Sequence, residues 1–146
     1  MARRELTYTA TDGRDKGRVF QLTEMSANDA ERWAIRAMLA LIRNGVDIPD
    51  DAMNSGMAGL ARVGITCLSK LNAEDALQLG DELMTCVRHI PNPKNPNVIR
   101  NLVEDDVEEI QTRLKLKVAV FRLHVDFSAA DALSTLASAS AVKSGA

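Results

Sequence analysis

The sequence predicts a mostly α-helical fold, in which a small helical domain carries an N-terminal β-hairpin. Aromatic residues make up only 3% of the chain, whereas alanine, leucine and methionine, which favour helices over strands, are plentiful. Apolar residues recur at helical spacing over 27–43, 73–88 and 104–127. Strand-like alternation is confined to the beginning of the chain, so we expect one hairpin on an otherwise helical domain.

The hairpin is predicted over about residues 5–24. Residues 6–9 and 18–23 alternate between polar and apolar side chains, and they flank a loop with two glycines, 12–17. An isolated hairpin is only marginally stable, so this one is expected to pack on the helices.

The first helix is predicted over 27–43. Ser26 is a suitable N-cap, and Gly45 stands where a left-handed residue ends many helices. At about 100° per residue its polar side chains form one narrow stripe, which includes Arg32, Arg36 and Arg43. The remaining arc is apolar or small, which places the helix centrally. It predicts burial for Trp33, Met38, Leu41 and Ile42.

The middle of the chain is predicted as a loop at 46–51, a short helix at 55–67 and a better helix at 73–88. Asn72 is the expected N-cap of the last of these. Three prolines within residues 91–96 cannot continue a helix, so that segment is interpreted as a rigid connector.

The last long helix is predicted over 104–127, with acidic residues first and basic residues last, as the helix dipole favours. It carries two opposite apolar rows. The first row consists of Val107, Ile110, Leu114, Val118, Phe121 and Val125, and the second of Leu116, Val120, Leu123 and Phe127. If the first row faces the core, the second faces away. Either the chain's own hairpin or C-terminal segment covers this second row, or it binds a helical partner or another copy of the protein.

The predicted domain extends over residues 1–136 and includes a short helix at about 128–136. The Ala/Ser-rich residues 137–146 are expected to form a flexible tail.

Composition limits the possible classes of protein. Eighteen basic and twenty acidic residues give a net charge of −2, which argues against a dedicated nucleic-acid binder. No apolar run reaches transmembrane length, and the N-terminus does not resemble a secretory signal. Two cysteines make no disulfide framework, so a soluble, cytoplasmic protein is expected.

No catalytic or metal-binding motif is found. Cysteines 67 and 86 and histidines 89 and 124 are the only candidates for a Cys/His catalytic pair or a zinc site, and the cysteines lie in apolar surroundings. The loop 13–18 matches no phosphate-binding motif and is interpreted as solvated. The carboxylates of 104–109 lack the spacing of a calcium loop and are interpreted as a charged helix start. We therefore expect no enzyme activity, cofactor or metal, and assign the arginine stripe to salt bridges or a protein partner.

Several segments resemble the tail assembly chaperones of long-tailed (siphovirus-type) bacteriophages. They are residues 17–25, 30–37, 45–49, 56–60 and 102–109, and the resemblance covers most of 13–127 but not the Ala/Ser tail. None of these segments is a catalytic motif, so no active-site residue is carried over.

The resemblance implies a non-enzymatic protein of the host cytoplasm that binds the tape measure protein, helps recruit tail tube protein and is absent from the mature virion. Candidate partner-binding residues are the second row of the last helix, Leu116, Val120, Leu123 and Phe127, followed by Arg32, Arg36 and Arg43. The alternative is a small structural tail protein, such as a tube-completion or connector subunit.

Overall fold

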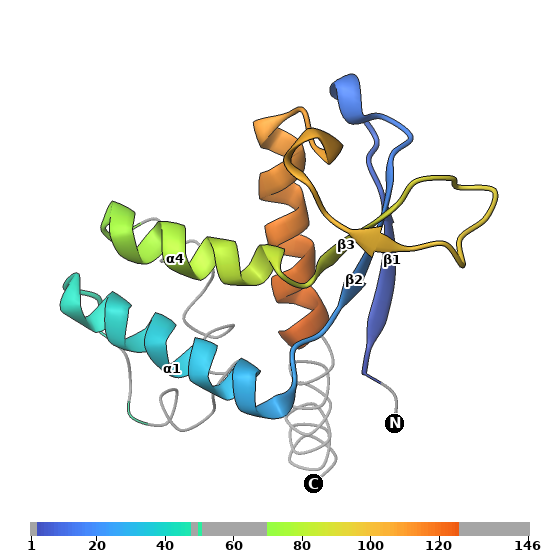
Figure 1. Cartoon of the computed structure of the whole chain (residues 1–146). Coiled ribbons are helices and arrows are strands. Elements are labelled where there is room, and N and C mark those ends of the chain that lie inside the picture. The colour runs from blue at the N-terminus through green and yellow to red at the C-terminus, as the bar shows by residue number, and fades with distance from the viewer. Residues whose placement is uncertain (1–2, 48–49, 51–69, 126–146) are drawn as a thin grey trace, which may run out of the picture. The chain divides into compact units, whose positions relative to one another are not determined.

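A computed structural model describes residues 3–47, 50 and 70–125, and the fold is given for these (Figure 1). The chain forms two compact units. The first contains residues 1–26 and 77–123, and the second contains 27–76 and 124–146. Each is described by itself. The predicted short helices at 55–67 and 128–136, and the tail 137–146, lie outside the described residues.

The first unit is built on a four-stranded antiparallel sheet of order β1-β2-β3-β4. Its strands are β1 (Glu5–Thr9), β2 (Val19–Thr23), β3 (Val87–Ile90) and β4 (Arg100–Asn101). Strands β1 and β2 form the predicted hairpin, with Thr7 opposite Gln21. Strand β3 then pairs with β2, placing His89 opposite Phe20, and β4 pairs with β3.

This sheet corrects the predicted fold class, because the protein is mixed α/β rather than mostly α-helical. The helix expected over 73–88 ends at Met84 as α4 (Ala73–Met84), and the residues after it turn into β3. Pairing explains the difference. On one face of the sheet Phe20, Leu22 and Val87 are all buried, and a third strand supplies backbone partners to β2 that a hairpin alone would leave to water.

Local signals set the end of α1 and the start of α4 where the sequence placed them. Helix α1 spans Ala27–Arg43, and Gly45 has φ of +88°. The amide of Gly45 bonds to the carbonyl of Ile42, and that of Val46 to Leu41, which is the Schellman pattern. Helix α4 is capped as predicted, since Asn72 Oδ1 accepts a hydrogen bond from the Asp75 amide at 2.9 Å.

The last helix begins later than predicted. Glu104–Asp106 form a 3-10 turn, and the regular helix covers residues 110–125 of the described chain. Trp33 and Met38 are fully buried, as predicted, but Ile42 is exposed.

Candidate functional site

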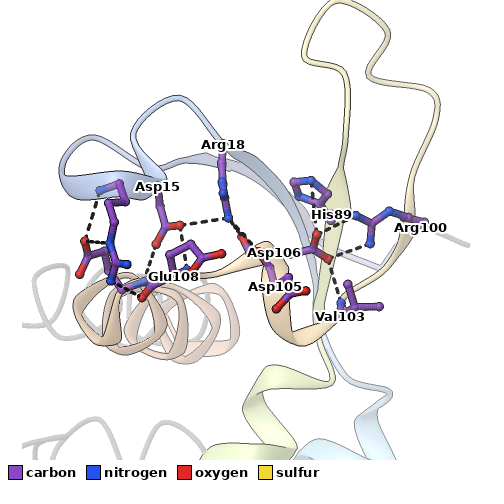
Figure 2. A network of polar contacts seen from close by, with 10 residues as sticks. Asp15, Arg18, His89, Arg100, Val103, Asp105, Asp106 and Glu108 are labelled. Atoms are coloured by element: carbon purple, nitrogen blue, oxygen red, sulfur yellow. Dashed lines mark hydrogen bonds and ion pairs between the residues drawn. The ribbon is translucent and has the colours of Figure 1, made fainter.

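The tip of the hairpin is anchored to the start of the last helix through a buried carboxylate. Asp15 lies in a 3-10 turn, Gly13–Asp15, and is fully buried. Its two oxygens accept hydrogen bonds from the amides of Glu108 and Glu109, each at 2.9 Å (Figure 2). Amides at the start of a helix have no hydrogen-bond acceptor within the helix. Asp15, which is far away in the sequence, supplies that acceptor and so caps the helix.

The environment of Asp15 keeps it ionised. Burial is the largest single influence and opposes the charge. The bonds from Glu108, Thr112 and Glu109, together with the nearby Arg18, outweigh burial and lower the pKa of Asp15 below its usual value. The loop predicted to be solvated is therefore docked, with its one buried acid at a helix N-terminus, where negative charge is favoured.

Two exposed ion pairs flank this contact. Arg14 Nε bonds Glu109 Oε1 at 2.9 Å, and Arg14 Nη2 bonds the carbonyl of Glu108. Lys115 Nζ lies 3.1 Å from Asp12 Oδ2. The charges of the loop and of the helix start are thus matched to each other.

A second buried carboxylate, Asp106, anchors the chain that follows β4. Its oxygens accept hydrogen bonds from both terminal nitrogens of Arg100, at 2.8 and 2.6 Å, and from the amide of Val103 at 2.8 Å. The bond with Arg100 is the main reason that the pKa of Asp106 is lowered. This local fold of 103–106 replaces the helical turn predicted there, so the carboxylates of 104–109 are not simply a charged helix start.

Arg18 joins the two anchors into one network. Its Nη1 donates to the carbonyls of Asp105 and Asp106, at 3.0 and 2.8 Å, and lies 3.2 Å from Asp15 Oδ1 (Figure 2). The Arg18 guanidinium therefore links the hairpin loop to the segment after β4, and the Asp15 carboxylate links the same loop to the start of the last helix.

An open cavity of about 450 Å³ lies beside this network. Lys16, Arg18, Asp105 and Asp106 contribute charged groups to its wall, and β3 contributes His89. The His89 ring lies beside the Phe20 ring, with 5.4 Å between ring centroids and 49° between the ring planes, and its Nε2 is 3.8 Å from Asp106 Oδ1. Burial lowers the pKa of His89 despite the neighbouring Asp106, so the ring favours the neutral form.

The wall of this cavity holds no hydroxyl or thiol for nucleophilic chemistry. Both Asp106 oxygens are already engaged by Arg100 and Val103. Over the residues that the structure describes, no three His, Cys, Asp or Glu side chains gather where they could hold a metal ion. The hydrogen bonds of Asp15 and Arg18 fix the hairpin loop against the start of the last helix.

The remaining candidates for chemistry are Cys86, His124 and Cys67. Cys86 is buried, and burial raises the pKa of its thiol to about 11, so it stays protonated near neutral pH. His124 is buried, and Cys67 lies outside the described residues.

The structure places the predicted partner-binding row of the last helix mainly inside. Leu116 and Val120 are fully buried, Leu123 is half-buried, and Phe127 lies outside the described residues. In the opposite row, Ile110 is 79% exposed and Leu114 is 55% exposed. The expectation that the whole first row faces the core is therefore wrong for its N-terminal half. The burial of Leu116 and Val120 favours the alternative that the chain itself covers the second row.

The arginines of α1 are exposed, as expected of a polar stripe, and Arg43 pairs with Asp75 at 3.0 Å. Beside them lies an apolar surface that the sequence analysis assigned to the core. It consists of Ile35, Leu39 and Ile42, which are between 39% and 45% exposed. Their i, i+4, i+7 spacing shows in the sequence that they share one side of the helix. Periodicity alone does not show which part of a broad apolar arc is covered by the rest of the protein.

Comparison of the chain with protein-family models, curated proteins and solved structures finds no match. In the described part of the chain, no helix combines the length and apolar character needed to cross a membrane.

Proposed function

We propose that this protein is a non-enzymatic assembly chaperone of a long-tailed bacteriophage, which holds a helical segment of the tape measure protein and assists tail tube assembly in the host cytoplasm. The resemblance of residues 13–127 to tail assembly chaperones supports the family. The exposed apolar row of α1, Ile35, Leu39 and Ile42, is the structural observation that carries the binding role.

Helix α1 is apolar on two sides. Trp33, Met38 and Leu41 are fully buried, whereas Ile35, Leu39 and Ile42 form an exposed row within about 60° of arc. A helix that only stabilised its own domain would need one apolar stripe, so a second, exposed one marks an interaction surface.

The chemistry of this surface fits an amphipathic helix as partner. The spacing of the row is that by which one helix docks along another. Arg32 lies on the adjacent stripe, at about 60° from Ile35, so a partner helix with an acidic residue beside its apolar face would be complementary. This surface replaces the row of Leu116 and Val120 as the main docking candidate.

Co-purification tests the proposal. The tagged chain is co-expressed with the tape measure protein of the same genome, alongside an Ile35→Ser/Leu39→Ser double variant. We expect the double variant to keep its circular dichroism spectrum and to lose most of the co-purified tape measure protein. Leu77→Ser, which changes a more exposed leucine on α4, is the matched control and should retain binding. Equal binding by all three chains would contradict the proposal.

Mass spectrometry of purified virions separates the two roles that the sequence left open. A chaperone is absent from the finished particle, whereas a tube-completion or connector subunit is present in a fixed number of copies.

A further inference from the structure

Among the residues that the structure describes, strand β1 forms one edge of the four-stranded sheet, and its outer side is fit for pairing. The bonds that flank the β1–β2 ladder show which backbone groups point outward. The amide of Glu24 bonds the carbonyl of Arg4, and the amide of Ala10 bonds the carbonyl of Arg18. Bonded pairs alternate along an antiparallel ladder. The even-numbered residues of β1 therefore bond to β2, and the N–H and C=O groups of Glu5, Thr7 and Thr9 point away from it.

This edge lacks several of the usual protections against pairing. Four of its five residues are exposed, and Leu6, at 44%, is one of them. The strand contains no proline and no lysine, and its pairing with β2 runs without a bulge. Natural edge strands commonly use such features to prevent association.

We propose that β1 pairs antiparallel with β1 of a second copy of this chain, about a twofold axis at Thr7, so that two four-stranded sheets become one continuous sheet. The inference is independent of the proposed chaperone role. In this register Glu5 lies opposite Thr9 of the second copy, and Thr7 lies opposite Thr7. All three outward-facing residues then meet as hydrogen-bonded pairs, each exchanging two backbone bonds.

The side chains are self-complementary in the same register. Leu6 of each copy lies opposite Tyr8 of the other, in the non-bonded pairs where side chains approach most closely. Within each copy these two residues pair across the sheet with Leu22 and Phe20, which are fully buried. The new pairs therefore extend an existing apolar face and cover the exposed part of Leu6.

Neighbouring registers are worse. A shift by two residues in either direction leaves two bonded pairs between the two strands instead of three. A shift by four residues in one direction places Glu5 opposite Glu5, and like charges directly opposite each other destabilise a sheet. A shift by four in the other direction places Glu5 opposite the Gly13–Asp15 turn, where the backbone is not extended. The number of bonded pairs and the charge pattern of β1 thus favour a second copy of itself in the register about Thr7. Five residues give a small interface, so a weak, concentration-dependent dimer is expected.

Sedimentation over a range of protein concentrations tests the proposal. The wild-type chain should shift from 15.9 kDa toward twice that mass as concentration rises. Thr7→Pro should stay monomeric with an unchanged circular dichroism spectrum, because the amide that it removes points away from β2 and proline is tolerated there.

Two substitutions at exposed Thr9 make the test independent of proline. Thr9→Lys places a cation opposite Glu5 of the second copy and should tighten the dimer about fivefold, whereas Thr9→Glu should weaken it by a similar factor. A monomeric wild-type chain at all concentrations would overturn the proposal, as would shifts of the same sign for both Thr9 variants. A wild-type monomer whose tape measure binding is lost in Thr7→Pro would assign the edge to that partner instead.

Discussion

Replacing Asp15 by alanine should destabilise the protein far more than its place in a surface loop suggests. The substitution leaves the amides of Glu108 and Glu109 without their acceptor, and it removes the carboxylate 3.2 Å from the Arg18 guanidinium. Both losses occur at the start of the last helix, where unpaired amides already accumulate.

The magnitude follows from the two kinds of contact. Loss of an N-capping side chain costs about 0.5–2 kcal/mol, and removal of one partner from a buried ion pair costs about 3–5 kcal/mol. Arg18 is one-third exposed, so solvent screens part of the second cost. We therefore expect a loss of about 2–4 kcal/mol in the free energy of unfolding. For a chain of this size that corresponds to a fall in Tm of roughly 6–16 °C.

Scanning calorimetry and hydrogen exchange measure the effect. Besides the lower Tm, the amides of Glu108 and Glu109 should lose their protection in Asp15→Ala. Asp12→Ala is the matched control from the same loop, because its carboxylate pairs with Lys115 but is 59% exposed; its Tm should stay within about 2 °C of wild type. Asp15→Asn keeps one acceptor oxygen and should fall between the two.

A Tm for Asp15→Ala equal to that of Asp12→Ala would refute this reasoning. It would mean that water replaces the carboxylate at no cost and that the hairpin tip is not held by its cap.

Four further predictions concern pH, the core and the buried thiol. The pKa values of Asp15 and Asp106 are lowered in the fold. The stability that these two carboxylates give the fold is therefore complete above the unfolded pKa of about 4 and is lost as the pH falls through the folded pKa values. Urea titrations at pH 7 and pH 3 should show a much lower midpoint at pH 3. The pKa of His89 is also lowered, so its protonation favours the unfolded chain once the pH falls below about 6.5; His89→Gln should flatten the stability curve between pH 6.5 and about 5, and an unchanged slope there would count against a buried neutral ring. Trp33→Ala should cost about 3–5 kcal/mol, because that side chain is fully buried, and a urea midpoint that hardly moves would show that the tryptophan is not a core residue. Finally, the thiol of Cys86, with a pKa of about 11, should react with a disulfide reagent at pH 8 far more slowly than free cysteine in a Cys67→Ser background, and should become reactive on unfolding.

Features that depend on neighbouring residues could be predicted from the sequence. Helix α1 has the predicted bounds because its end is set by Gly45, whose positive φ a glycine adopts without strain. The start of α4 was predictable for a similar reason, since Asn72 bonds an amide three residues away. Burial of Trp33 and Met38 followed from their place on a helix with one narrow polar stripe. In each case the deciding atoms lie within a few residues of one another.

The remaining features depend on contacts between residues that are distant in the sequence. Residues 87–90 form a strand because they pair with β2, which lies some seventy positions earlier in the sequence. No local sequence pattern indicates that pairing. Asp15 caps a helix that begins more than ninety residues later, so the loop appeared solvated when its sequence was considered alone. Helical periodicity predicted the two apolar rows of the last helix. Which row is buried at a given position along the helix depends on the parts of the chain that pack against it. That is why Leu116 is buried while Ile110 is exposed.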